Sequence, residues 1–201
     1  MKTDLISNAL ETLCGLANGF MENIDARGDE WISLTSMVDH DGATNPAARN
    51  KIVMCVYNIT RETPMSTYPT SVTSIPPNGG GVSFPVVNPA IHINIHLMFM
   101  ANFSEKQYGD GLTALSRLIS FFQQTPYFTR ARAPGLSPQI DKLTMDFESL
   151  SAVDVNYVMG MLGTRYFPSA FYKLRMLPFV SNAMQSRAYP VGAAAASLAP
   201  S

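Results

Sequence analysis

The chain has 201 residues, a length that fits one domain with its own hydrophobic core. Its 14 Lys and Arg residues nearly balance 15 Asp and Glu residues, giving a formal net charge of −1, so nucleic acid bound by positive charge is not expected. Charged residues make up 14% of the chain, against roughly 25% in ordinary soluble domains. Because charged residues are depleted at interface cores, this favours a subunit partly covered by neighbours. The alternative is a neutral monomer solvated by Ser, Thr and Asn.

The cysteines and the N-terminus indicate the compartment. Cys14 and Cys55 lie in apolar runs without C-x-x-C spacing, which predicts buried free thiols in a reducing compartment. Asp4, Ser7 and Glu11 interrupt the stretch that would have to be apolar in a signal peptide. No segment reaches the roughly 18 continuous apolar residues of a membrane span. We therefore expect assembly in the cytoplasm and no membrane span.

Hydrophobic periodicity predicts the first elements of the chain. Apolar residues recur every three to four positions over residues 5–20, which predicts an amphipathic helix that ends at Gly19 or in the region of Asn23. Alternation over residues 31–36 and the continuous apolar run 52–57 predict a pair of strands. They are joined by a polar loop with a turn at residues 39–42.

A long irregular stretch precedes the clearest strand. Residues 63–89 contain six prolines and three consecutive glycines, a composition that cannot hold a helix or a central strand. Because the sequences on both sides favour strands of one sheet, we expect a projecting arm or lid here, not a domain boundary. Over residues 90–103, isoleucine and leucine alternate with His92, Asn94 and His96, which predicts a strand with a polar stripe.

A long helix is predicted next, from Ser104 to Thr125. Ser104 and Gln107 match the spacing of a capping box at its start. Its expected apolar face consists of Leu112, Leu115, Ile119 and Phe122.

Three further elements complete the prediction. Residues 143–148 alternate as a half-buried strand, and residues 171–180 are expected to form the last strand. Between them, Ser151 is the expected N-cap of a short helix that ends at Gly163. The apolar face of this helix comprises Val155, Val158, Met159 and Leu162.

The order of elements predicts the fold class. Strands mixed with helices outside a strict βαβ rhythm, without an internal repeat, favour an α+β fold. We expect a single domain in which the helices pack on one face of a mixed, mainly antiparallel sheet. This domain is expected to span residues 1–187, with the long Pro- and Gly-rich arm at 63–89, and to be followed by an Ala-rich C-terminal tail at 188–201.

The histidines do not predict a metal site. His92 and His96 are four residues apart, which on a strand is roughly 13 Å and too far for one ion. The loop Asp39–Gly42 lacks the third oxygen ligand and the closing Glu of a calcium loop, so a polar hairpin loop is the better interpretation. Both patterns therefore favour polar surface over metal binding.

No other pattern requires catalysis. Asp146 and Glu148 share a strand face as a paired-carboxylate candidate, but a solvated sheet face is the favoured interpretation. The glycine triplet 79–81 is not followed by the residues of a phosphate loop. Arg130 and Arg132 form only a small basic spot. We therefore expect no catalytic, cofactor-binding or metal-binding residues, no cofactor and no enzymatic activity.

Two stretches of the sequence carry a family-level pattern. The first consists of Ala101–Phe103, Tyr108, the Leu115 region and Ile119–Gln123. The second consists of Leu143–Ser151, Val155–Asn156, Met161–Gly163, Tyr166, Pro168–Ser169 and Tyr172–Arg175. Together they resemble the tail-terminator or cap proteins of extracellular contractile injection systems, the virulence-cassette and antifeeding-prophage type. With the first predicted helix and the strand that ends at Asn58, the resemblance covers residues 1–180.

The resemblance implies a structural role in a bacterial phage-tail-like particle. In that family a homo-hexameric ring closes the baseplate-distal end of the inner tube and sheath, ends polymerisation and holds the sheath extended. The implied partners are further copies of the chain, the inner tube protein and the sheath protein, in particles that assemble in the cytoplasm before any release. The residues leave two alternatives open. These are a monomeric peptide- or ligand-binding module that uses the arm, and an enzyme with a site around His92, His96 and Asp146.

Overall fold

The computed structural model describes most of the chain. The described residues are 4–39, 41–62, 84–87, 91–179 and 184–188. The chain divides into two compact units, one made of residues 1–62 and 92–177 and the other of residues 63–91 and 178–201. Most of the predicted arm and of the predicted tail lies outside the described residues, so the boundary expected after residue 187 stays a prediction.

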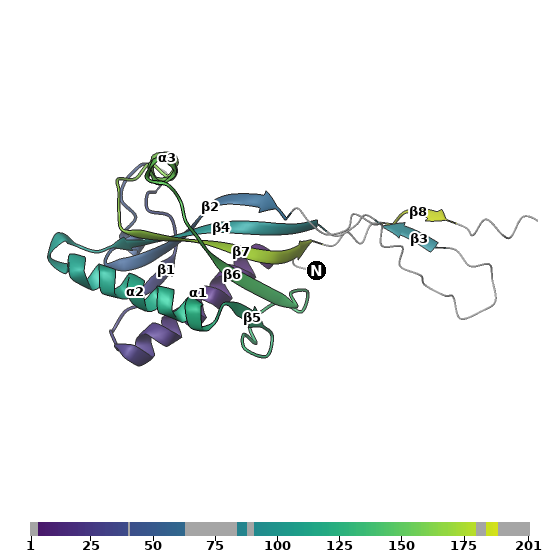
Figure 1. Ribbon diagram of the computed structural model, residues 1–201, viewed down its shortest axis with the longest axis horizontal. Helices are drawn as coiled ribbons and strands as arrows, with labels where there is room; N and C mark the ends of the chain where they lie inside the picture. The colour runs from purple at the N-terminus through teal and green to yellow at the C-terminus, as the bar shows by residue number, and fades with distance from the viewer. Residues whose placement is uncertain (1–3, 40, 63–83, 88–90, 180–183, 189–201) are drawn as a thin grey trace, which may run out of the picture. The chain divides into compact units, whose positions relative to one another are not determined.

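The first unit contains a six-stranded sheet, in the order β1-β2-β4-β7-β6-β5 (Figure 1). Its strands are β1 (Ile32–Leu34), β2 (Lys51–Arg61), β4 (Ile91–Asn102), β5 (Tyr127–Thr129), β6 (Lys142–Glu148) and β7 (Ser169–Phe179). Pairs β2–β4, β5–β6 and β6–β7 are antiparallel, whereas β1 and β2 are parallel. Three α-helices join this sheet among the described residues: α1 (Leu5–Ile24), α2 (Tyr108–Gln124) and α3 (Ala152–Met161). The α+β class with a mixed, mainly antiparallel sheet is confirmed.

The second unit contains a two-stranded antiparallel ribbon. Its strands, β3 (Phe84–Val87) and β8 (Met184–Ala188), were not predicted. Proline argues against a central strand because it cannot donate to the ladder. In a two-stranded ribbon both strands are edges, which is why Pro85 can lie within β3.

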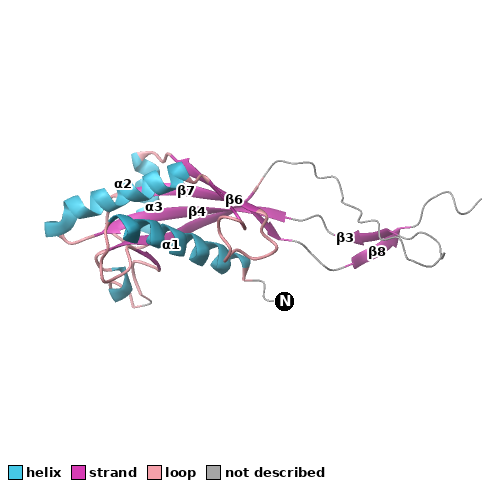
Figure 2. Ribbon diagram, turned by 90° about the horizontal axis from the view of Figure 1, so that it is seen from below, coloured by secondary structure: helices cyan, strands magenta, loops and turns pink. Residues whose placement is uncertain are grey.

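The strand alternation predicted for β4 defines the two faces of the sheet. On one face, Phe99 packs against Phe122 of α2, with ring centroids 5.5 Å apart, and Phe122 also contacts Tyr172 of β7 at 5.0 Å. The neighbouring residues of β4, Met98 and Met100, point to the opposite face. Figures 1 and 2 show α1 and α2 together on one side of the sheet and α3 on the other.

The expectation that all helices share one face therefore holds for α1 and α2 only. Val158 and Met159 of α3 belong to a buried cluster on the second face, together with Met98, Met100 and Phe171. The cause is the second face of β4, which is apolar near its C-terminal end and needs cover there. Ser151 is the N-cap of α3, as predicted, and it forms a capping box in which the Ser151 and Asp154 side chains each bind the other's backbone N–H.

The buried face of α2 is rotated relative to the prediction. Leu115 and Phe122 are buried as expected, but Leu112 is 43% and Ile119 38% exposed. The buried side is completed by Gly111, Ala114, Leu118 and Phe121. At Gly111 a Cβ atom would lie 3.0 Å from the Phe103 ring, so the start of α2 approaches the sheet closely. Ser104 does not cap the helix backbone; a 3-10 turn over Glu105–Gln107 precedes α2 instead.

The parallel pair β1–β2 departs from the hairpin that the sequence suggested. The polar loop does turn tightly, because Gly42 N–H donates to Asp39 O at 2.9 Å and Val38 bridges Thr44. The chain then turns again through Pro46–Ala48 and enters β2 in the same direction as β1. Hydrophobic periodicity does not report how often the chain changes direction between two strands, so the sequence could not predict the parallel pairing.

Two asparagines of α1 fix the helix against backbone elsewhere in the unit. Asn18 receives a hydrogen bond from Ile32 N–H at 2.8 Å and donates one to Ile32 O at 2.9 Å, which satisfies β1 at the sheet edge. Asn8 makes a similar pair of hydrogen bonds to the loop before β6. Its side-chain amide donates to Gly135 O and accepts from Ser137 N–H. Each amide thus both donates to and accepts from the backbone of the segment that it contacts.

We predict that Leu115→Asp destabilises the protein by ~3 kcal/mol or more, because it buries an unpaired charge between α2 and the sheet. Leu112→Asp, on the exposed side of the same helix, is the matched control and should change the unfolding free energy by less than ~1 kcal/mol. Urea unfolding followed by circular dichroism measures both. Equal midpoints for the two variants would contradict the assignment of the buried face.

Candidate functional site

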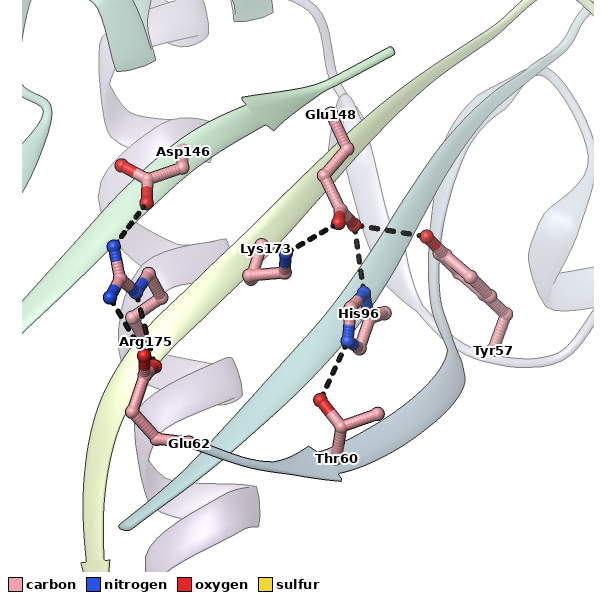
Figure 3. A network of polar contacts seen from close by, with 8 residues as sticks. All are labelled: Tyr57, Thr60, Glu62, His96, Asp146, Glu148, Lys173 and Arg175. Carbon is pink, nitrogen blue, oxygen red and sulfur yellow. Dashed lines mark hydrogen bonds and ion pairs between the residues drawn. The ribbon is translucent and has the colours of Figure 1, made fainter. Parts of the chain in front are cut away.

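The sheet face that carries α3 is polar where α3 does not cover it. Figure 3 shows the side chains that meet there, from β2 and the residue after it, β4, β6 and β7. They are Tyr57, Thr60, Glu62, His96, Asp146, Glu148, Lys173 and Arg175. Their alternation along each strand puts them on the same side as Met98 and Met100. A β-bulge between Val56 and Asn58 changes the alternation of β2, which places both Tyr57 and Thr60 toward the network.

Glu148 is the centre of the larger group of contacts. Its carboxylate accepts hydrogen bonds from Lys173 Nζ at 2.8 Å, from His96 Nδ1 at 2.8 Å and from Tyr57 Oη at 3.0 Å. The other ring nitrogen of His96 lies 2.9 Å from Thr60 Oγ1. Since an ionised carboxylate only accepts, His96 Nδ1 carries a proton whether the ring is neutral or charged.

Arg175 is the centre of the second group. Its guanidinium binds the Glu62 carboxylate through two hydrogen bonds of 2.7 and 3.1 Å, and its remaining terminal nitrogen lies 3.3 Å from Asp146. Such a bidentate pair fixes geometry as well as charge. Asn94 is 7% exposed and also hydrogen-bonds Glu62, while its Oδ1 atom has no partner among the described residues.

The contacts stabilise the ordinary charge states of these groups. Burial alone would raise the pKa of Glu148, but hydrogen bonds from Lys173, His96 and Tyr57 outweigh burial and lower it. Arg175 likewise lowers the pKa of Glu62. Burial and the adjacent Glu148 charge raise the pKa of Tyr57. A general acid or base needs a pKa near the working pH, whereas these shifts lead away from neutrality.

Two of the residues proposed as an alternative enzyme site have different partners in the network. His96 belongs to the Glu148 group, whereas Asp146 belongs to the Arg175 group. Asp146 and Glu148 do share a strand face, as predicted, yet each is held by a different cation of β7. Within the described part of the chain, no three His, Cys, Asp or Glu side chains are placed to hold a metal ion.

The thiols are poor nucleophiles. Burial raises the pKa of Cys14 to about 11 and that of Cys55 to about 12, so both are protonated at neutral pH. Cys55 borders a crevice of about 260 Å³ beside β1, whose lining residues carry no charge. This crevice offers shape and apolar contact without a reactive group.

Exposed apolar side chains gather on two helices. On α3, Val153, Tyr157 and Met161 are between 61 and 69% exposed and follow one another at four-residue spacing. Tyr108, Leu112 and Ile119 lie along one side of α2. These surfaces are better suited to contact another protein than to bind a small polar substrate.

Among the described helices, none is both long and apolar enough to cross a membrane. The Pvc16 N-terminal domain model matches residues 5–193 of the chain. The chain belongs to this family.

Two solved structures have a similar fold to this Pvc16 N-terminal domain. One is the sheath/tube terminator of an extracellular contractile injection system, PVC, in the extended state, with a TM-score of 0.62 and 12% identity. The other is the tube-terminating cap of the anti-feeding prophage, with a TM-score of 0.53 and 11% identity. Both matches cover all of this chain, which spans 65% and 61% of those chains. No curated protein matches it.

Sequence reasoning found part of the polar surface of this Pvc16 N-terminal domain. The stripe of His92, Asn94 and His96 and the shared face of Asp146 and Glu148 were predicted from alternation alone. Tyr57, Thr60, Glu62, Lys173 and Arg175 were missed. The only available signal was alternation on their own strands, because their partners lie up to 113 residues away.

We predict that His96→Ala lowers the unfolding free energy by about 1–3 kcal/mol, because it removes a hydrogen bond from a partly buried carboxylate. His92→Ala, on the same side of β4, is the matched control and should have a smaller effect. Urea titration at pH 7 measures both. Equal effects would show that the Glu148 contacts contribute no more to stability than any other half-buried position of this strand.

The pKa of Glu148 gives a second prediction. Because this pKa is lower in the folded chain than its ordinary value of 4.5, the carboxylate stabilises the fold above that pH, and the stabilisation is lost as pH falls through the folded-state pKa. Glu148→Gln should therefore lower stability at pH 7 and reduce the dependence of stability on pH below about 5. The exposed Glu11→Gln is the control. Parallel urea-midpoint curves for wild type and Glu148→Gln would contradict this role.

Proposed function

We propose that this chain is a structural terminator that closes the baseplate-distal end of a phage-tail-like contractile injection system. The observation that carries the proposal is the family match over residues 5–193, together with a fold shared with two chains described as a terminator and a cap. In this role the chain ends polymerisation of the inner tube and sheath and keeps the sheath extended. Assembly takes place in the cytoplasm, and the finished particle is then available for release.

The partners proposed are the inner tube protein, the sheath protein and further copies of the chain in a ring of six. Two features of the surface support a subunit of an assembly. Only 14% of the residues are charged, and the exposed apolar side chains of α2 and α3 gather in groups. A closed ring buries such surfaces without leaving an open end.

A non-catalytic role agrees with the polar network. The carboxylates of Glu62, Asp146 and Glu148 are each held by a cation of β7. These contacts stabilise the sheet, and the pKa shifts of Glu62, Glu148 and Tyr57 lead away from neutrality.

Deleting the gene for this chain tests the proposal by electron microscopy. Particles should then have irregular tube and sheath lengths or lack a closed distal end, and supplying the full chain should restore uniform particles. Averaged images of restored particles should show a six-fold layer at that end. Uniform, closed particles without the chain would overturn the terminator function, and a layer of another symmetry would overturn the ring of six.

A further inference from the structure

The exposed apolar side chains are not scattered over the described surface. Of its twelve large exposed hydrophobic residues, eight fall into two groups. The α3 patch consists of Val153, Tyr157, Met161 and, in the loop that follows, Tyr166. The α2 patch consists of Tyr108, Leu112 and Ile119 of that helix with Phe147 of β6. Single exposed apolar residues are ordinary, whereas grouped ones mark contact surfaces.

The α3 patch belongs to a helix that is apolar on both sides. Val158 and Met159 face the sheet, while Val153, Tyr157 and Met161 face away from it. A helix that is apolar all round is normally covered all round. In α3 the outward side is covered by nothing in the described part of the chain.

The α2 patch follows the side of its helix away from α1. Residues 108, 112 and 119 are spaced by four and seven, so they lie along one line of the helix. Phe147 continues the patch, because its ring packs 5.2 Å from Tyr172, which contacts Phe122 of α2 at 5.0 Å. The patch therefore extends from the helix onto the neighbouring sheet.

The two patches lie on opposite faces of the same sheet, so one chain cannot bury them against each other (Figure 1). Two different patches on opposite sides are what a head-to-tail contact between copies requires, and such contacts produce a ring when the rotation closes. Each patch contains two aromatic rings, and a covered aromatic side chain buries about 150–250 Å². Each patch is therefore of the order of half the roughly 800 Å² that one partner buries in a standard interface.

The charges near the patches are compatible with this contact. The two charged residues of α2 are Asp110 and Arg117, and Arg117 points toward α1, where it pairs with Asp25 at 2.9 Å. The single charged residue of α3, Asp154, is held in its capping box. Arg117 and Asp154 already have partners, so docking one patch on the other would leave neither of them as an unpaired buried charge.

We propose that the α3 patch of one copy docks on the α2 patch of the next copy, forming the contact that repeats around the ring. This inference rests on the proposed function for its setting, a ring at the end of a particle. Beyond that function, the inference names the two surfaces that meet between neighbouring subunits. Tyr157 of one subunit faces Leu112 and Ile119 of the next.

Disulfide trapping between two differently marked chains tests this contact. One chain carries Tyr157→Cys and the other Ile119→Cys; both are produced together in cells that assemble particles, and purified particles are oxidised. We expect a disulfide-linked dimer that contains one chain of each kind. In the control, Thr113→Cys replaces Ile119→Cys; Thr113 is exposed on α2 but borders the side near Trp31 and Arg117, so no mixed dimer is expected.

The outcomes separate this contact from the proposed function. Particles that carry the chain at one end but give no Tyr157–Ile119 dimer, or give as much dimer with the Thr113→Cys control, would overturn the contact and leave the terminator function intact. If the chain is absent from particles, the terminator function fails. In that case the two purified chains are mixed in solution and oxidised in the same way. Absence of the mixed dimer there also overturns the contact.

Discussion

The alternation of side chains along the central strand β4 is the constraint on which the molecule depends. Successive residues point to opposite faces, so one strand presents a continuous apolar face to α1 and α2 and a divided face to the other side. On the divided face, Met98 and Met100 need cover, and α3 supplies it. His96 and Asn94, two and four residues earlier, begin a polar surface instead. The position of α3 therefore follows from where β4 changes from polar to apolar.

The polar half of that face stabilises the sheet by pairing across strands. Lys173 and Arg175 alternate with apolar residues on β7, and each pairs with a carboxylate of β6, while Arg175 also reaches Glu62 beyond the end of β2. Ion pairs at a surface contribute little singly, but linked hydrogen bonds to partly buried carboxylates contribute more. Each of the three carboxylates on this face therefore has a cationic partner on β7.

The apolar surfaces lie elsewhere, on the outward sides of α2 and α3. This separation has a physical consequence for assembly. A polar sheet face is stable in water without a partner, whereas grouped apolar side chains gain free energy only when they are covered. The terminator function proposed for this chain requires contacts between protein subunits, and α2 and α3 are the elements that offer apolar surface for such contacts.

The sequence by itself determined the elements whose signals are local. Periodicity placed α1, β4 and α3, the Ser151–Asp154 cap follows from neighbouring residues, and the polar stripe of β4 followed from strict alternation. Tertiary structure decided the rest. The rotation of α2, which exposes Leu112 and Ile119, depends on the close approach at Gly111, and the parallel pairing of β1 with β2 depends on a second turn in the connection. The Glu148 contacts join residues 52 and 91 positions apart. Periodicity reports which side of an element is apolar, but only packing decides which element covers that side and which distant charge meets which.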